Sequence, residues 1–351
     1  MVISSLQLTG FRSYVENEFE LSSGVTIVVG PNASGKTNLL EALLVLAKGK
    51  SYRADTVDLV HHDTLQARLA LSSPTQDRVV VIDRSGEKLV RELSVDGVVK
   101  SRWRKEDDLP VVLFEPEHMR MVAGSPTLRR AYIDGILETT VSGYKTALSR
   151  YTRCLTQRNS LLKHQRASDQ QLFVWDIKLA EYALEIVTWR KRVSEKINER
   201  IGDYYAQIAG THAPISLSYS VAVAVENYQS ALLAALHKTH DTDRMRGFTG
   251  VGPHRDDIQL LLNDQPAAAS ASRGESRSII LSLKLSEMSL LEEAYNQKPL
   301  FLLDDVFSEL DQDRQKALAK ALAGSQTVLT TTNADTWVRF KSGHFETILL
   351  G

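Results

Sequence analysis

One eight-residue segment constrains the fold of this chain more than any other. The run Gly30-Pro31-Asn32-Ala33-Ser34-Gly35-Lys36-Thr37 fits the glycine-rich P-loop pattern, and Asn38 continues it. The run follows the apolar residues 25–29 and precedes the leucine-rich residues 37–48, so we expect it to join a buried strand to a helix. Glycines let backbone N–H groups curl around a phosphate, and a helix start adds unpaired amides and a positive dipole end. We therefore predict a nucleotide site in an α/β domain.

The residue types at the end of this motif indicate separate roles. Lys36 places a cation on the terminal phosphates, and the Thr37 hydroxyl is a candidate Mg²⁺ ligand. A second motif, Phe301-Leu302-Leu303-Asp304-Asp305, ends an apolar strand with carboxylates, as a Walker B motif does. We expect Asp304 to hold Mg²⁺ and Asp305 to act where hydrolysis needs a base or a water-orienting group.

A third motif favours one class of nucleotide-binding protein. Ser272-Arg273-Gly274-Glu275 opens a predicted helix between the P-loop and the Walker B motif. A serine and glycine at a helix start form a second anion site, although an ordinary helix cap has the same sequence. One chain has no second nucleotide for this site, so we expect it to contact the ATP of a partner subunit. That is the arrangement of ABC-type ATPases, and it predicts a homodimer.

The order of elements predicts the fold class. We expect an α/β fold: an ABC-type P-loop ATPase domain with a mixed sheet and an antiparallel meander, built from both termini and interrupted by a mainly helical subdomain. The expected divisions are residues 1–122, 123–245 and 246–351. Residues 66–103 are predicted to form the meander, with Asp96-Gly97 as a hairpin turn. Further strands are expected at residues 111–114, 258–262, 299–303 and 327–331, a linker at 267–271 and a helix at 275–295.

The central region has a helical pattern from residue 126 to about 210. Apolar residues there recur three and four apart, which predicts one inward face of a long amphipathic helix. The residues of this face are Trp175, Leu179, Tyr182, Ile186, Trp189, Val193, Ile197 and Ile201.

Composition excludes several classes of protein. The single cysteine, Cys154, excludes a disulfide scaffold and a multi-cysteine zinc site, and indicates a reducing cytoplasm. No apolar run approaches a membrane span, and the first residues do not resemble a secretory signal. With 42 basic and 43 acidic residues, the net charge is -1, so DNA binding would need local positive charge. Two candidate patches on the sequence are Arg190, Lys191, Arg192, Lys196 and Arg200, and Arg102, Arg104 and Lys105.

Taken together, the motifs resemble the RecF family, in the branch of ABC-type ATPases that includes SMC proteins. The resemblance covers nearly the whole chain and includes Ser308-Glu309-Leu310-Asp311, where ABC-type ATPases have a loop that contacts the dimer partner. The most specific segments are Gly252 to Asp257 and Leu302 to Asp311 with Arg314. The other segments that resemble the family are Leu8 to Tyr14, Lys36 to Ala42, Lys50 to Arg53, Phe114 to Glu117, Gly124 to Pro126 with Arg129, Arg130 and Asp134, and Gln157 to Asn159.

The resemblance implies a function that spacing alone does not give. Proteins of this family bind duplex DNA beside single-stranded gaps when ATP is present. They act with RecO and RecR to help load the RecA recombinase. ATP closes the dimer and slow hydrolysis reopens it.

Two departures bear on this expectation. The family more often has Ser-Gln-Gly-Gln where this chain has Ser272-Arg273-Gly274-Glu275. The run Thr330-Thr331-Thr332-Asn333 has no switch histidine of the kind found in many ABC-type ATPases, which predicts slow hydrolysis.

Other hypotheses remain open at this point. A membrane transporter ATPase subunit has the same three motifs, but it usually has the switch histidine and a glutamate in place of Asp305. A small-molecule kinase needs no Ser272, and the helical region is short for an SMC-like tether. The Asn-Lys-x-Asp motif of GTPases does not occur in the sequence.

Overall fold

A computed structural model of the chain describes residues 2–100, 104–163, 168–223, 225–305, 307, 310–332 and 345–351. They form two compact units: residues 1–119 with 287–351, and residues 120–286. The second expected boundary differs from this division, because residues 246–286 belong to the second unit. The reason is strand pairing, since β10 (Asp257–Leu262) is the antiparallel partner of β9 (Ile215–Ser220). None of the helices within the described ranges is long and apolar enough to cross a membrane.

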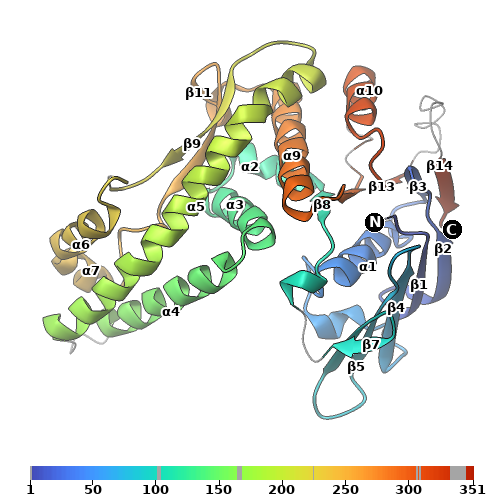
Figure 1. Cartoon of the computed structure of the whole chain (residues 1–351), viewed down its shortest axis with the longest axis horizontal. Coiled ribbons are helices and arrows are strands. Elements are labelled where there is room, and N and C mark those ends of the chain that lie inside the picture. Colours follow the sequence, from blue (N-terminus) through green and yellow to red (C-terminus); the bar gives the residue numbers. More distant parts are fainter. Residues whose placement is uncertain are drawn as a thin grey trace. The chain divides into compact units, whose positions relative to one another are not determined.

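A five-stranded parallel sheet brings the two ends of the chain together in the first unit. Its strands lie in the order β14-β3-β13-β12-β8, and the pairs of neighbours are parallel. Figure 1 shows the blue β3 beside the dark red β13 and β14. The strands are β3 (Val25–Val29), β8 (Val111–Phe114), β12 (Leu300–Leu303), β13 (Thr327–Thr331) and β14 (Phe345–Leu349). The sequence predicted four of these strands, and β14 was not expected.

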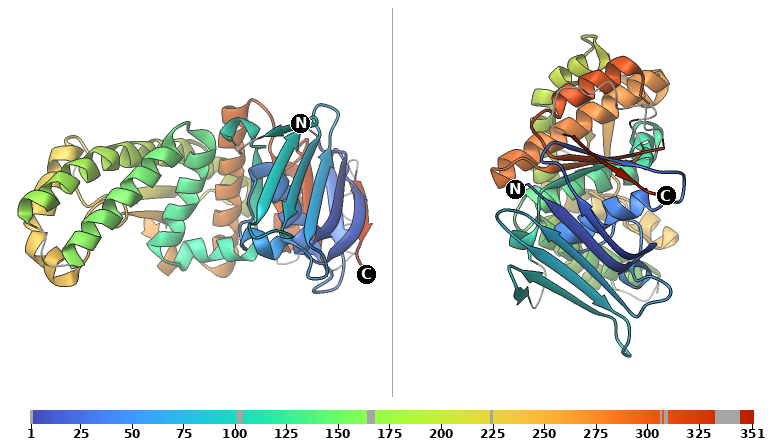
Figure 2. Two further views of the ribbon diagram at one scale, coloured as in Figure 1. Left: turned by 90° about the horizontal axis from the view of Figure 1, so that it is seen from below. Right: turned by 90° about the vertical axis from the view of Figure 1, so that its right-hand side faces the viewer.

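A six-stranded antiparallel sheet forms the other layer of the first unit, in the order β2-β1-β4-β5-β6-β7. Figure 2 shows these strands side by side, coloured dark blue to cyan. Asp96 and Gly97 join the last two strands with φ angles of 52° and 77°, as the predicted hairpin turn requires. The strands are β1 (Ser5–Phe11), β2 (Tyr14–Glu20), β4 (Gln66–Ser72), β5 (Arg78–Asp83), β6 (Val90–Val95) and β7 (Val98–Lys100).

Helix α1 (Lys36–Lys48) packs against strands of both sheets. Its residues from Leu39 to Ala47 are all buried, which explains why the helix is apolar on every side. Gly49 ends the helix in the left-handed conformation that favours glycine. Three short helices and one longer one complete the unit: η1 (Thr56–Leu59), η2 (Lys105–Asp107), η3 (Pro116–Met119) and α10 (Gln312–Ala321).

The second unit consists mainly of helices, as expected. Its longest helix, α5 (Asp169–Ala209), begins with a capping box between Ser168 and Gln171 and ends at Gly210. Within the predicted apolar face, Trp175, Tyr182 and Trp189 are only half-buried. The remaining residues of that face are buried, so the core-facing side is rotated slightly from the predicted one.

The other elements of this unit are shorter, and the division between units falls inside α9. A short helix over residues 267–270 replaces most of the linker expected at residues 267–271, and a two-residue strand precedes it. The elements are α2 (Arg120–Ala123), α3 (Pro126–Thr140), α4 (Tyr144–Lys163), α6 (Tyr228–Lys238), α7 (His240–Arg246), β11 (Gln265–Pro266), α8 (Ala267–Ser270) and α9 (Arg273–Tyr295).

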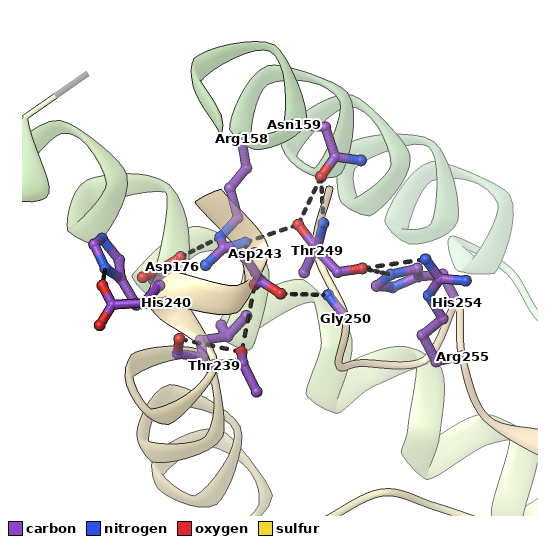
Figure 3. A network of polar contacts seen from close by, with 12 residues as sticks. Arg158, Asn159, Asp176, Thr239, His240, Asp243, Thr249, Gly250, His254 and Arg255 are labelled. Atoms are coloured by element: carbon purple, nitrogen blue, oxygen red, sulfur yellow. Dashed lines mark hydrogen bonds and ion pairs between the residues drawn. The ribbon is translucent and has the colours of Figure 1, made fainter. Parts of the chain in front are cut away.

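Buried arginines hold the second unit together. Arg158 on α4 is fully buried and donates to Asp176 on α5 at 2.6 Å and to Asp243 on α7 at 2.9 Å (Figure 3). Arg190 on α5 donates to both carboxylate oxygens of Asp134 on α3 at 2.8 Å. Each charge is paired, which is the condition for keeping a charge buried. Because Arg190 is buried, it cannot belong to the exposed basic patch predicted for this helix.

His254 ties the adjoining loop to this network (Figure 3). Its Nδ1 lies 2.6 Å from the Tyr151 hydroxyl and its Nε2 lies 3.1 Å from the Thr249 carbonyl oxygen. A neutral imidazole with the proton on Nε2 satisfies both contacts. Burial lowers the pKa of His254 to about 4, and the nearby charges of Arg255, Arg130 and Arg158 act in the same direction.

This pKa predicts a loss of stability in mild acid. In the unfolded chain the His254 imidazole is protonated near pH 6.5, whereas in the folded protein it stays neutral down to about pH 4. The contribution of His254 to the free energy of unfolding is therefore fully present above pH 6.5. It decreases by about 3 kcal/mol as the pH drops to 4. Urea unfolding of the His254→Asn variant, followed by circular dichroism between pH 4 and 7, should show a shallower pH dependence than wild type. The exposed His212→Asn change is the control, and equal slopes for wild type and His254→Asn would contradict the assignment.

Candidate nucleotide-binding site

The P-loop has the backbone conformation that phosphate binding needs. It joins β3 to α1, with Ala33 and Gly35 at φ angles of 67° and 98°. A Cβ atom at Gly30 would lie 2.8 Å from the backbone carbonyl oxygen of Leu350, and Gly35 has a φ angle that residues with a side chain rarely adopt. Both positions therefore require glycine. Backbone turns that contain left-handed residues can point neighbouring N–H groups into one concave surface, which binds anions.

Two polar groups of the loop fit an anionic ligand. Lys36 is buried, and its Nζ donates to the carbonyl oxygens of Gly30 at 2.9 Å and Pro31 at 2.8 Å. The Ser34 hydroxyl is buried and has no hydrogen-bonding partner among the described residues. A buried hydroxyl without a partner is costly in a folded protein, and a ligand phosphate would satisfy it. The loop therefore suits the triphosphate end of a nucleotide.

The two predicted metal ligands lie in contact. Thr37 lies at the start of α1, and Asp304 directly follows β12. Thr37 Oγ1 donates to Asp304 Oδ1 at 3.1 Å. Thr330 on β13 donates to the same carboxylate oxygen at 2.8 Å. Burial raises the pKa of Asp304, and the bonds from Thr330 and Thr37 partly oppose that shift. A hydroxyl and a carboxylate on adjacent elements are oxygen ligands of the kind Mg²⁺ prefers.

Asp305 follows Asp304 in the left-handed region, with a φ of 52°. Its backbone N–H donates to Thr330 Oγ1 at 2.8 Å. Val306, Ser308 and Glu309 lie outside the described residues, whereas Leu310 is buried and Asp311 caps α10 by accepting from the Arg314 amide. Asp311 therefore acts locally as the N-cap of α10.

A buried carboxylate supports the P-loop helix from behind. Glu41 on α1 is fully buried and accepts two hydrogen bonds from Arg12 at 2.8 Å and one from Arg53 at 2.8 Å. Arg53 also donates to Asn38 at 2.5 Å. Burial alone would raise the pKa of Glu41, but hydrogen bonds from Arg12, Arg53 and Ser51 hold it below its ordinary value. Sequence reasoning did not assign this role, although Glu41 is the one acid in an otherwise apolar stretch.

The third motif forms a helix cap in the second unit. Ser272 Oγ accepts from the Glu275 amide at 3.3 Å, and Glu275 Oε2 accepts from the Ser272 amide at 2.8 Å. This reciprocal pair is a capping box at the start of α9. Glu275, one of the two residues of this motif that depart from the family pattern, thus has a local structural role.

The two predicted DNA-contacting patches lie only in part within the described residues. Arg102 and the side chain of Lys105 lie outside the described residues, and the exposed Arg104 pairs with Glu106 at 3.0 Å. On α5, Lys191, Arg192 and Lys196 are exposed. Arg200 is half-buried, so of the five predicted residues of this patch only Arg190 is removed from the surface.

Comparison with known proteins agrees with this geometry. A family model described as the RecF/RecN/SMC N-terminal domain matches residues 2–340. The protein named "DNA replication and repair protein RecF" from Acaryochloris marina is 34% identical, covering 95% of this chain and 93% of its own. The protein of the same name from Acidothermus cellulolyticus is 36% identical, covering 95% and 94%.

Solved structures agree as well. "Structure of the recombination mediator protein RecF-ATP in RecFOR pathway" superposes with a TM-score of 0.82 at 30% identity, over 95% of this chain and 93% of that one. An SMC head bound to a domain of ScpA superposes with a TM-score of 0.57 at 16% identity, which supports the fold alone. The fold and the P-loop site define an ABC-type ATPase of the RecF and SMC-head class. Within that class, the chain belongs to the RecF family.

The Glu41 cluster predicts a stability effect separate from ligand binding. The Glu41→Gln change leaves Arg12 and Arg53 without their shared charge, and losing one partner of a buried pair costs about 3 kcal/mol. We expect the urea midpoint of unfolding to fall accordingly. The exposed Glu16→Gln change on β2 should leave the midpoint unchanged. Equal midpoints for Glu41→Gln and wild type would show that the cluster does not support the helix.

Proposed function

We propose that this protein is an ATP-dependent DNA-binding protein of recombinational gap repair and replication. Two copies close on duplex DNA beside a single-strand gap when ATP binds, and slow hydrolysis reopens them. The observation that carries the proposal is the contact between Thr37 and Asp304, which places two metal-ligand types together at the end of an anion-binding loop. The RecF relatives named for DNA replication and repair support the choice of DNA.

The residues of the first unit divide the work of holding the nucleotide. Gly30, Pro31, Asn32, Ala33, Ser34, Gly35 and Asn38 would surround the phosphates, with Lys36 supplying the positive charge. Thr37 and Asp304 would hold Mg²⁺, which neutralises charge on the phosphate oxygens. Asp305 would orient the attacking water, and we assign catalytic roles to Lys36 and Asp305.

The residues of the second unit would act across the dimer. Ser272, Arg273, Gly274 and Glu275 begin α9, where a helix dipole and a hydroxyl suit the terminal phosphate held by the partner subunit. Glu275 adds a negative charge at this point. We expect that charge to oppose phosphate binding, so the closed dimer should be less stable than one with glutamine there.

The wider function follows from the relatives. RecR and RecO are the proposed partners, with RecA loading as the outcome, in the cytoplasm where gapped chromosomal DNA occurs. These partners are supported by the similar solved structure of RecF with ATP, which is described as a recombination mediator of the RecFOR pathway. The alternative of an ABC transporter subunit receives no support from the relatives.

The first test is DNA binding under nucleotide control. Fluorescence anisotropy of a labelled gapped duplex should show binding with ATP and Mg²⁺, and binding at least about tenfold weaker with ADP and Mg²⁺. Lys36→Met should abolish the ATP effect because the phosphates lose their cation. Lys88→Met, on an exposed loop, is the control. Equal binding with ATP and ADP would contradict the nucleotide gate, and no binding with either would contradict the DNA-binding function.

A further inference from the structure

Thr330 stands between the two Walker B aspartates. It lies on β13, which neighbours β12 in the parallel sheet, and the pairing of Leu303 with Leu329 brings it level with Asp304. The side chain is fully buried. Its position is therefore set by the sheet and not by solvent.

The Thr330 hydroxyl makes two short contacts there, and the Leu303 carbonyl oxygen lies farther away, at 3.5 Å. Thr330 Oγ1 donates its proton to Asp304 Oδ1 at 2.8 Å and accepts the Asp305 N–H at 2.8 Å. A hydroxyl is suited to this because it donates and accepts at the same atom. Valine has nearly the same shape and can do neither, whereas serine keeps both functions.

The two contacts control different properties of the site. The contact with Asp304 fixes the carboxylate oxygen that also faces Thr37. The contact with Asp305 holds a backbone with a φ of 52°, which residues other than glycine seldom adopt. Thr37 and Thr330 both donate to Asp304, but Thr37 is also a proposed metal ligand. A change at Thr330 therefore tests the positioning of Asp304 without removing a metal ligand.

We propose that Thr330 is a positioning residue that sets both Walker B aspartates, Asp304 for the metal and Asp305 for hydrolysis. This inference rests on the proposed function of the site as a Mg²⁺-dependent ATPase. Partners that orient metal ligands in this way change metal affinity or activity by about 10- to 100-fold when removed. Thr330→Val should therefore weaken metal binding and slow cleavage, with little change in nucleotide binding without metal.

The experiment compares wild type with Thr330→Val, Thr330→Ala, Thr330→Ser and Thr327→Val. Thr327 is the matched control: it lies on the same strand, is buried, and within the described structure its hydroxyl contacts only the Ser325 carbonyl, at 3.4 Å. Three quantities are measured on the full chain: affinity for a fluorescent ATP analogue in EDTA, Mn²⁺ affinity with ADP by electron paramagnetic resonance, and single-turnover ATP cleavage.

We expect both variants without the hydroxyl to lose at least about tenfold in Mn²⁺ affinity and in cleavage, and Thr330→Ser to recover both. Thr327→Val should match wild type. The proposal is overturned if the valine or alanine variant binds Mn²⁺ and cleaves ATP as wild type does, or if serine fails to rescue. A Thr327→Val variant with equal losses would also overturn it, because the effect would then be a general loss of strand packing. Thr330→Ala keeps the test decisive if valine prevents folding.

Failure of the proposed function gives a different result. A wild-type protein that neither binds the ATP analogue nor cleaves ATP contradicts the ATPase itself, and with it the role of Thr330. If the wild-type protein binds and cleaves ATP and the Thr330→Val variant does so equally well, only the role of Thr330 is contradicted.

Discussion

The contact between Thr37 and Asp304 depends on residues 267 positions apart in the chain. It forms because β3 and β12 belong to one parallel sheet, so the carboxyl ends of both strands lie at the same edge. Ligand sites in open α/β sheets form at this edge, where loops leave the strands. The inserted second unit is compatible with the site because both ends of the chain return to the first. The site therefore depends on the pairing, in one sheet, of strands from the two ends of the chain.

The buried charges of the structural ion pairs differ from those of the phosphate loop. In the second unit, the buried Arg158 and Arg190 form ion pairs with aspartates on other helices, which favours one arrangement of those helices, although Arg158 Nη2 has no hydrogen-bonding partner among the described residues. In the first unit, Lys36 donates only to backbone carbonyls and the Ser34 hydroxyl lacks a partner among the described residues. The first pattern fits a structural role. The second fits a site that gains its missing interactions from an anionic ligand.

The elements around the motifs could be predicted from the sequence because each combines a strong local pattern with a turn or cap residue. Strands β3 and β12, helix α1 and the Asp96-Gly97 hairpin are examples. The strand β14 could not be predicted, because it is a largely exposed edge strand whose pairing with β3 is decided by the sheet. The burial of Arg190 and the roles of Glu41 and Thr330 were missed for a related reason. Their hydrogen-bonding partners are distant in sequence. A charged or hydroxyl side chain in a helix or strand does not by itself indicate which residues it will contact.

In the proposed dimer, each nucleotide site is completed by a second copy of the chain. Mixing two inactive variants tests it directly: Lys36→Met lacks the phosphate-binding cation, and Ser272→Arg blocks the α9 helix start. In a randomly mixed dimer, half of the dimers contain both variants and one of their two sites is intact, so ATP hydrolysis should recover to about one quarter of wild type. A mixture as inactive as either variant alone would contradict a site shared between two subunits.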